Sequence, residues 1–130
     1  MKVESALESI TVTPLAGYPA LYMTWEKQIH VQDVKVAFRT ITARLQESKE
    51  PLYVIVDLSN QPRIPIVDTM VEALRGPFRN EKLTEWLVIG TTRDARWIAD
   101  LLTKAAGRNN IQWFDAKEDV FTYLEGEKAF

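Results

Sequence analysis

Residues 52–65 read Leu52-Tyr-Val-Ile-Val-Asp-Leu-Ser-Asn-Gln-Pro-Arg-Ile-Pro65, an apolar run that changes abruptly into a polar segment. The run is rich in β-branched and aromatic residues that do not alternate with polar ones, which is typical of a strand covered on both faces. Such a strand belongs in the middle of a parallel sheet. Open α/β sheets bind ligands and partners outside the carboxyl ends of their strands. Residues 58–65 are therefore the first candidate for a functional segment.

Length and composition predict one globular domain that spans residues 1–130. Apolar residues make up 46% of the chain and charged residues 26%, close to the averages for globular proteins. The chain has no cysteine and a single histidine, so we expect no disulfide, no metal and no cofactor. The net charge of -2 carries no basic stripe, which argues against a nucleic-acid partner. The first residues lack the apolar middle of a signal peptide and no apolar run is long enough for a membrane span, so we expect a cytoplasmic protein.

Two short β-prone runs, residues 6–13 and 21–26, flank the turn-forming stretch Pro14-Leu-Ala-Gly-Tyr-Pro19. This arrangement predicts an antiparallel hairpin at the edge of the sheet. A helix over residues 31–48 should follow, with His30 at its N-cap and Asp33 as the far member of a capping box. Steps of three and four residues place five apolar side chains on its inner face: Val31, Val34, Phe38, Ile41 and Leu45.

Three further helices are expected after the central strand. The first starts at Pro65 and stops at Gly76-Pro77, with an apolar face formed by Val67, Met70, Val71, Leu74 and Phe78. The next follows a buried strand at residues 86–91, is capped by Thr92 and closes at Gly107. The last follows a strand at residues 111–114, is capped by Asp115 and gives way to a polar tail at Gly126. The order ββαβαβαβα predicts an α/β fold with a single mixed, mostly parallel sheet, a leading antiparallel hairpin and about four helices.

This organisation resembles the STAS domain, the SpoIIAA-like fold of bacterial anti-anti-sigma factors. The residues that carry the resemblance are Tyr53-Val-Ile-Val-Asp-Leu-Ser59 and Ile111-Gln-Trp-Phe-Asp-Ala-Lys-Glu-Asp-Val-Phe-Thr-Tyr-Leu124. The resemblance implies a non-enzymatic regulatory or protein-interaction module in bacterial signalling. The chain departs from the family in one respect. In anti-anti-sigma factors, a kinase phosphorylates a serine at the start of the helix that follows the central strand. Here that stretch is Gln61-Pro-Arg-Ile-Pro-Ile-Val-Asp68, without a hydroxyl at the helix start, which leaves Ser59 and Thr69 as the candidates for phosphorylation.

Several polar residues are predicted at the carboxyl ends of the parallel strands, where they could bind a partner or ligand. They are Asp57, Ser59, Asn60, Gln61, Arg63, Thr92 and Arg93. The same residue types cap helices and form turns whatever the function, so each also has a purely structural interpretation. Trp97 lies one position away from the inner face of its helix, which makes it a candidate interface residue.

Three functions remain open at this point. The first is a protein-interaction module that binds another protein, or a second copy in a homodimer, through residues 58–65 and the following helix. The alternative is a small-molecule or lipid-binding domain, which requires an apolar cavity. An enzyme is the least favoured of the three. The chain lacks the Cys, His-cluster and metal-ligand patterns of the common catalytic sites.

Overall fold

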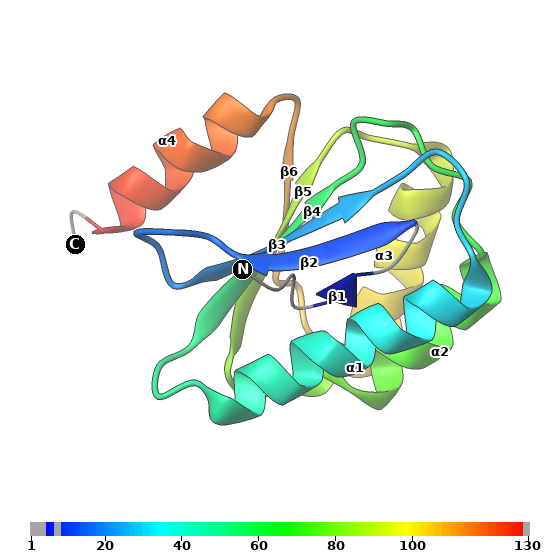
Figure 1. Cartoon of the computed structure of the whole chain (residues 1–130), viewed down its shortest axis with the longest axis horizontal. Coiled ribbons are helices and arrows are strands. Elements are labelled where there is room, and N and C mark those ends of the chain that lie inside the picture. The colour runs from blue at the N-terminus through cyan, green and yellow to red at the C-terminus, as the bar shows by residue number, and fades with distance from the viewer. Residues whose placement is uncertain (1–4, 7–8, 129–130) are drawn as a thin grey trace.

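The computed structural model describes residues 5–6 and 9–128. A mixed sheet with the strand order β1-β2-β3-β4-β5-β6 runs through the middle of the molecule, with helices on both faces (Figure 1). The strands are β1 (Ser5–Ala6), β2 (Ile10–Pro14), β3 (Ala20–Trp25), β4 (Leu52–Asp57), β5 (Leu83–Ile89) and β6 (Ile111–Phe114). The helices are α1 (Val31–Glu47), α2 (Ile66–Arg75), α3 (Arg93–Ala106) and α4 (Lys117–Lys128), with a 3₁₀ turn η1 (Pro77–Arg79).

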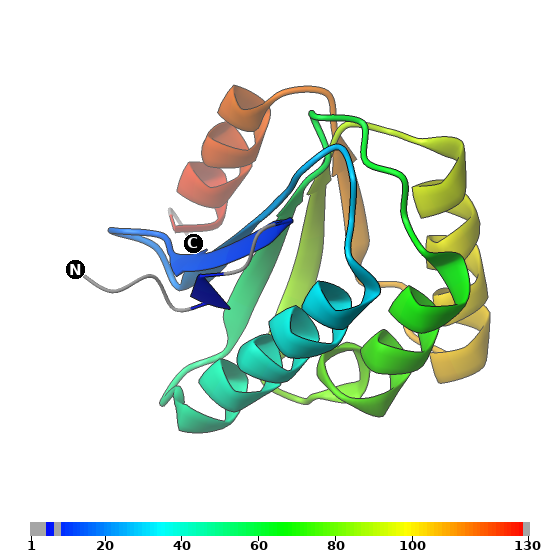
Figure 2. The ribbon, with the colours of Figure 1, turned by 45° about the vertical axis from the view of Figure 1, so that its right-hand side comes forward.

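The connections explain why the two faces are covered unequally. β1, β2 and β3 pair antiparallel, whereas β3, β4, β5 and β6 pair parallel. Each parallel connection moves one strand further in the same direction, so right-handed crossovers put α1, α2 and α3 on one face. α4 follows the last strand and lies on the opposite face by itself (Figure 2). The predicted α/β class, leading hairpin and mostly parallel sheet are confirmed.

β4 is buried on both faces, as its unalternated apolar sequence predicts. Val54 belongs to the core between the sheet and α1 to α3, whereas its neighbour Ile55 belongs to the core beneath α4. Both side chains are fully buried. Successive side chains of a strand point to opposite faces, so only a strand between two layers needs apolar residues at every position.

The start of α1 departs from the predicted capping box. His30 occupies the N-cap position, but its side chain makes no capping hydrogen bond. Ser9 completes the cap instead: its hydroxyl accepts from the His30 N–H at 3.0 Å and donates to the Asp33 carboxylate at 2.6 Å. Asp33 therefore meets a residue from the sheet edge rather than the N–H of His30, and this ties α1 to the segment before β2.

The predicted inner face of α2 is wrong for Val67 and Val71, although Met70, Leu74 and Phe78 do contact the core. Val67 and Val71 are 68% and 39% exposed, whereas Thr69, Glu72 and Ala73 are buried. Met70 and Leu74 are half-buried at the margin of the core, and Phe78 is buried in η1 rather than in the helix. The helix is rotated relative to its apolar stripe, so that small residues face the sheet and a carboxylate faces α1.

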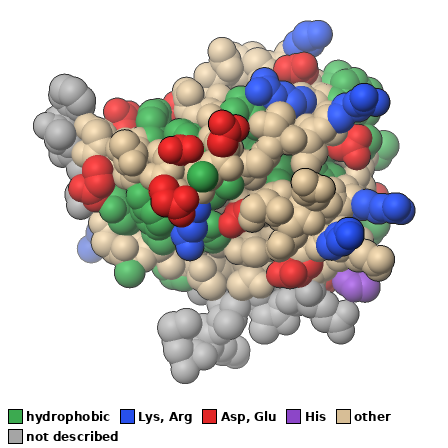
Figure 3. All heavy atoms as spheres, turned by 90° about the horizontal axis from the view of Figure 1, so that it is seen from above, with side chains coloured by type: hydrophobic (Ala, Val, Ile, Leu, Met, Phe, Trp, Pro, Cys, Tyr) green, Lys and Arg blue, Asp and Glu red, His purple; other side chains and the backbone are tan. Residues whose placement is uncertain are grey.

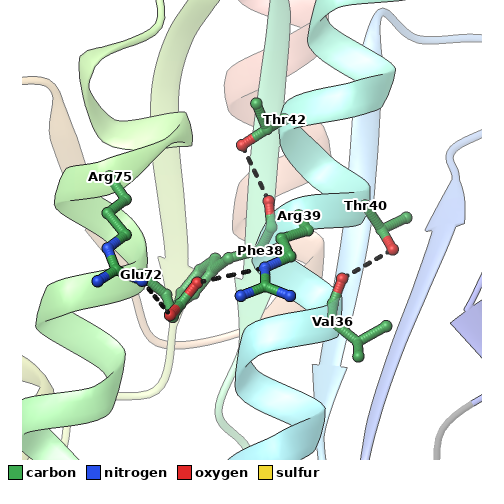
Figure 4. A network of polar contacts seen from close by, with 7 residues as sticks. All are labelled: Val36, Phe38, Arg39, Thr40, Thr42, Glu72 and Arg75. Atoms are coloured by element: carbon green, nitrogen blue, oxygen red, sulfur yellow. Dashed lines mark hydrogen bonds and ion pairs between the residues drawn. The ribbon is translucent and has the colours of Figure 1, made fainter.

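Two features mark the contact between α1 and α2 in this orientation. The carboxylate of Glu72 lies 3.9 Å from Arg39 of α1 and 3.7 Å from Arg75 of its own helix, and Figure 4 shows all three side chains meeting. Gly76 approaches α1 so closely that an added Cβ would lie 2.5 Å from the Thr42 hydroxyl oxygen. Aromatic rings lie beneath α2, with Trp86 stacked on Phe78 at 6.1 Å between ring centroids.

The remaining elements differ from expectation mainly at their ends. Thr92 caps α3 by accepting from the Ala95 N–H at 3.0 Å, and Gly107 ends the helix with a φ of 68°, both as predicted. β5 begins at Leu83, earlier than the predicted start at residue 86. α4 begins at Lys117, so that Ala116 rather than Asp115 precedes it, and it continues past Gly126 to Lys128. A glycine weakens a helix but does not by itself end one.

Candidate functional site

Asp57, the last residue of β4, is the centre of a polar cluster at the carboxyl end of the sheet. Its carboxylate accepts from the Tyr22 hydroxyl at 2.5 Å, from the Ser59 hydroxyl at 2.5 Å and from the Ser59 N–H at 3.0 Å. The ammonium of Lys117, the first residue of α4, lies 4.9 Å from the centre of the Tyr22 ring. We call Tyr22, Asp57, Ser59 and Lys117 the Asp57 cluster. It joins β3, β4, the following loop and α4.

The electrostatics of the cluster hold Asp57 ionised and Tyr22 protonated. Burial raises the pKa of Asp57, but hydrogen bonds from Ser59 and Tyr22 and the charge of Lys117 outweigh it and keep this pKa below its ordinary value. The pKa of Tyr22 is raised strongly by burial, by its hydrogen bond to Asp57 and by the carboxylate charges of Asp57 and Glu118. A carboxylate that is ionised beside a phenol that is protonated near neutral pH suits an anchor for the loop better than a general acid or base.

The loop at residues 58–65 is held in place by hydrogen bonds while Ser59, Asn60, Gln61 and Arg63 remain exposed. The Asn60 amide donates to the Trp25 carbonyl at 3.0 Å, and the Arg63 N–H donates to the Lys27 carbonyl at 3.0 Å. Gln61 adopts a φ of 53°, a left-handed conformation that few non-glycine residues take. Pro62 and Ile64 are buried, whereas Gln61 and Arg63, which alternate with them, are exposed. The loop therefore presents Ser59, Asn60, Gln61 and Arg63 on a fixed backbone.

Gly90 allows the neighbouring strand end to approach this loop. Its φ is 84°, and an added Cβ would lie 3.3 Å from the backbone carbon and oxygen of Leu58. The Leu58 N–H donates to the Ile89 carbonyl at 2.9 Å, which extends the pairing of β4 and β5 beyond the strands. Only glycine fits this position without strain.

The structure brings together some of the residues that the sequence singled out, but not all. Asp57, Ser59 and Asn60 join the loop and its anchor, and Gln61 and Arg63 are exposed beside them. Among the described residues, no hydrogen bond or ion pair links Thr92 or Arg93 to the Asp57 cluster; Thr92 serves as a helix cap and Arg93 is exposed. Viewed from above in Figure 3, acidic side chains gather on the left over α4, and basic side chains lie mainly on the opposite side.

Of the two hydroxyls considered for phosphorylation, only Ser59 is exposed. Thr69 lies on the inner face of α2 and is only 7% exposed, so a kinase could not reach it in the folded chain. Ser59 is therefore the candidate of the two that the folded chain leaves accessible.

The outer surface of α2 and α3 is a second candidate region. Three apolar side chains of these helices are exposed, Val67 and Val71 of α2 and Trp97 of α3, of which Trp97 is 53% exposed. α2 packs between α1 and α3. Glu72 faces α1, and at 100° per residue Val71 and Val67 lie on the side of α2 away from Glu72. We call these three residues the α2–α3 apolar patch.

Trp97 fits the same surface. The neighbouring Arg96 guanidinium lies 4.4 Å from the centre of the Trp113 ring in β6, so that side of α3 faces the sheet edge. Trp97, 100° further round the helix, is turned away from β6. Its partial exposure agrees with the prediction from its place beside the inner face, whereas the exposure of the two valines was not predicted.

Sequence reasoning missed Tyr22 and Lys117, which complete the Asp57 cluster. Tyr22 was predicted only as part of a strand, and Lys117 only as part of the last helix. Their meeting depends on the register of β3 against β4, in which Tyr22 pairs with Ile55, and on the path of the chain from β6 into α4. The sequence carries no local signal for either.

A second polar cluster, on the α4 side of the sheet, was also missed. The Glu85 carboxylate accepts from the Tyr123 hydroxyl and, at 3.0 Å, from the Gln112 amide. The pKa of Tyr123 is raised strongly by burial and by Glu85. The cluster fastens α4 to β5 and β6. Within the described ranges, no three His, Asp or Glu side chains are arranged to hold a metal ion.

The helices described here include none that is both long and apolar enough to cross a membrane. No family model and no curated protein matches the sequence. The structure is similar to the crystal structure of an uncharacterized protein of the DUF3478 family from Shewanella loihica PV-4, which has a SpoIIAA-like fold. The TM-score is 0.62 at 13% sequence identity, over 89% of this chain and 92% of the other. At this identity the likeness concerns the fold alone: the chain has a SpoIIAA-like α/β fold.

Proposed function

We propose that the chain is a non-enzymatic, STAS-type module that binds a partner protein, or a second copy of itself, through the loop at residues 58–65 and the α2–α3 apolar patch. The observation that carries the proposal is the exposure of Val67 and Trp97, at 68% and 53%. Within the monomer, α2 gains little from the apolar side chains of Val67 and Val71, because both are turned to solvent. Exposed apolar patches rimmed by polar residues are typical of interaction sites.

The rigid loop beside the patch supports the same proposal. Ser59, Gln61 and Arg63 supply hydrogen-bond donors and acceptors at the start of α2, next to the exposed Val67. An apolar centre with a polar rim is the usual anatomy of a protein interface. The anchored backbone lowers the ordering cost of binding, because the loop is already held in one conformation.

The non-enzymatic part of the proposal is supported by the chemistry of the site. The Ser59 hydroxyl donates to an ionised Asp57, and the strong acceptor beside it is committed to that bond and to Tyr22. A nucleophilic serine needs a neighbouring base that can take up its proton. A carboxylate whose pKa lies below its ordinary value is a weak base for this purpose.

The test compares the wild-type chain with a Val67→Ser/Trp97→Ser double variant. Val31→Ser is the matched control, because Val31 is also an exposed valine, at 40%, but lies at the start of α1. Each protein is used for affinity capture from the native host lysate, with mass spectrometry as the readout, and for analytical ultracentrifugation. We expect the double variant to lose the captured protein or the self-association, while the control retains it.

Two results would contradict the proposal. One is a wild-type chain that captures nothing reproducibly and remains monomeric. The other is a partner that the double variant binds as strongly as the wild type does. If mass spectrometry finds phosphate on Ser59 in protein from the host, this would also indicate that the loop is the regulated part of the interface.

A further inference from the structure

A groove of about 230 Å³ lies between α1 and α2. Side chains three and four residues apart share one side of a helix, and on each helix such a set lines the groove. The polar members and the glycine are Arg39, Thr42 and Gln46 of α1, with Glu72, Arg75 and Gly76 from the end of α2. The groove is larger than the apolar cavity of about 80 Å³ between the sheet and α2 and α3, and both polar and apolar atoms form its wall.

Glu72 lies deep in this groove, and its carboxylate lacks hydrogen bonds. The side chain is 5% exposed, whereas those of Arg39 and Arg75 are 65% and 69% exposed and lie at the rim (Figure 4). Their nitrogen atoms are 3.9 and 3.7 Å from the Glu72 oxygens, beyond the roughly 2.7–3.2 Å of an N–H···O hydrogen bond. Among the residues that the structure describes, none donates a hydrogen bond to this carboxylate. Buried polar groups are nearly always hydrogen-bonded, so Glu72 calls for a donor.

The two arginines at the rim keep donors for a ligand. A guanidinium carries several N–H groups in a planar fork that matches the two oxygens of a carboxylate. Within residues 5–6 and 9–128, neither Arg39 nor Arg75 donates a hydrogen bond to the protein. The groove therefore has an acceptor without donors at depth and donors without acceptors at its rim.

We propose that this groove binds a small zwitterion of the α-amino acid type. The ammonium group of the ligand donates to Glu72, and its carboxylate accepts from Arg39 and Arg75. Such a ligand satisfies the buried acceptor and the exposed donors together.

Thr42 supplies a second acceptor beside Glu72. Its hydroxyl donates to the Phe38 carbonyl at 3.0 Å, so its oxygen still has lone pairs that can accept from the ammonium group. Gly76 leaves this oxygen uncovered, because an added Cβ would lie 2.5 Å from it.

A ligand with a single charge fits the groove less well. An anion would meet the Glu72 carboxylate beside the guanidinium groups and would leave that carboxylate without a donor. A cation would be repelled by two guanidinium groups that lie 3.9 and 3.7 Å from the same carboxylate. The volume admits a compact amino acid, since an apolar cavity of roughly 150 Å³ in another protein binds benzene.

The test is an NMR titration of the isotope-labelled chain with three matched probes: 2-aminobutyrate, butyrate and 1-aminopropane. Butyrate lacks the ammonium group, and 1-aminopropane lacks the carboxylate. We expect 2-aminobutyrate to shift the Gly76 amide and the Arg39 Nε–H resonances along saturating curves at fixed ionic strength. It should bind at least about tenfold more tightly than either singly charged probe. The indole resonance of Trp97, in the α2–α3 apolar patch, should not move.

Variants then assign the two ends of the ligand. Glu72→Gln keeps the shape and removes the charge, and we expect it to weaken 2-aminobutyrate binding about tenfold while butyrate binds at least as tightly as before. Arg39→Gln should weaken the binding of both carboxylate probes and strengthen that of 1-aminopropane. The Val67→Ser/Trp97→Ser double variant is the matched control and should bind 2-aminobutyrate as the wild type does, which keeps this proposal separate from the proposed interface.

Equal binding of 2-aminobutyrate and butyrate would overturn the proposal, because the arginines would then form a simple anion site. Equal binding of 2-aminobutyrate and 1-aminopropane would overturn it as well, as would the absence of a saturating response at Gly76 and Arg39. These comparisons use the wild-type chain, so they decide the question even if Glu72→Gln does not fold.

Discussion

The hydrogen bond from Tyr22 to Asp57 offers the sharpest test of the electrostatics at the end of β4. Tyr22→Phe removes the hydroxyl and leaves the ring in place. A hydrogen bond to a charged group contributes about 1.5–3 kcal/mol to stability. Asp57 is half-buried and keeps both donors of Ser59, so we expect a loss near the lower end, about 1.5 kcal/mol.

The effect should depend on pH with a definite sign. The pKa of Asp57 is lowered in the folded chain from an ordinary value of 3.8. A group with a lowered pKa contributes its full stabilisation above the ordinary value, and this contribution is lost as the pH falls through the folded pKa. The difference between wild type and Tyr22→Phe should therefore be constant near neutral pH and shrink below about pH 4.

Urea unfolding followed by tryptophan fluorescence measures both quantities, since the chain has four tryptophans. Tyr53→Phe is the matched control: Tyr53 lies in β4 and belongs to the core on the same face of the sheet as Tyr22, but no hydrogen bond joins its hydroxyl to a described residue. We expect the control to change the free energy of unfolding by less than about 0.5 kcal/mol. A Tyr22→Phe loss no larger than that of the control, or one that persists unchanged in acid, would refute the reasoning.

The same unfolding assay checks three further predictions. Ser9→Ala should cost about 1–3 kcal/mol, because a buried hydroxyl that bridges two groups at the start of α1 is lost; a neutral result would mean that the cap closes without it. Gly90→Ala should cost about 2–3 kcal/mol, since its φ is positive and its Cβ would press on Leu58, whereas Gly17→Ala, with a similar φ and open space, should cost only about 1 kcal/mol. Glu72→Leu should change stability by less than about 1 kcal/mol or increase it, because its arginine partners are largely exposed and remain hydrated. A loss above about 3 kcal/mol would show instead that the ion pairs hold α2 in place.

Local signals were sufficient for the class of fold. The unalternated run at residues 52–58 required a strand between two layers, and β4 is that strand. The Thr92 cap and the left-handed Gly107 set the ends of α3, because capping and backbone sterics act within one turn of a helix. Strands separated by helices then required crossovers of one hand, which order the sheet.

The candidate site was predicted only in part. Asp57 and Ser59 were placed correctly at the end of the central strand, because the end of an apolar run is visible in the sequence. Their partner Tyr22 was not foreseen, since it comes from 35 residues away in the chain. Strand register and the path of the last helix bring that phenol to the carboxylate.

Tertiary structure alone decided the orientation of α2, and with it the α2–α3 apolar patch. The apolar stripe of this helix predicted that Val67 and Val71 would face the core, as periodicity does for any surface helix. The neighbouring elements overrode it: the close approach of Gly76 to α1 goes with a rotation in which Thr69 and Ala73, rather than the two valines, are buried. Periodicity records which faces a helix has, but steric fit with its neighbours determines which face is buried.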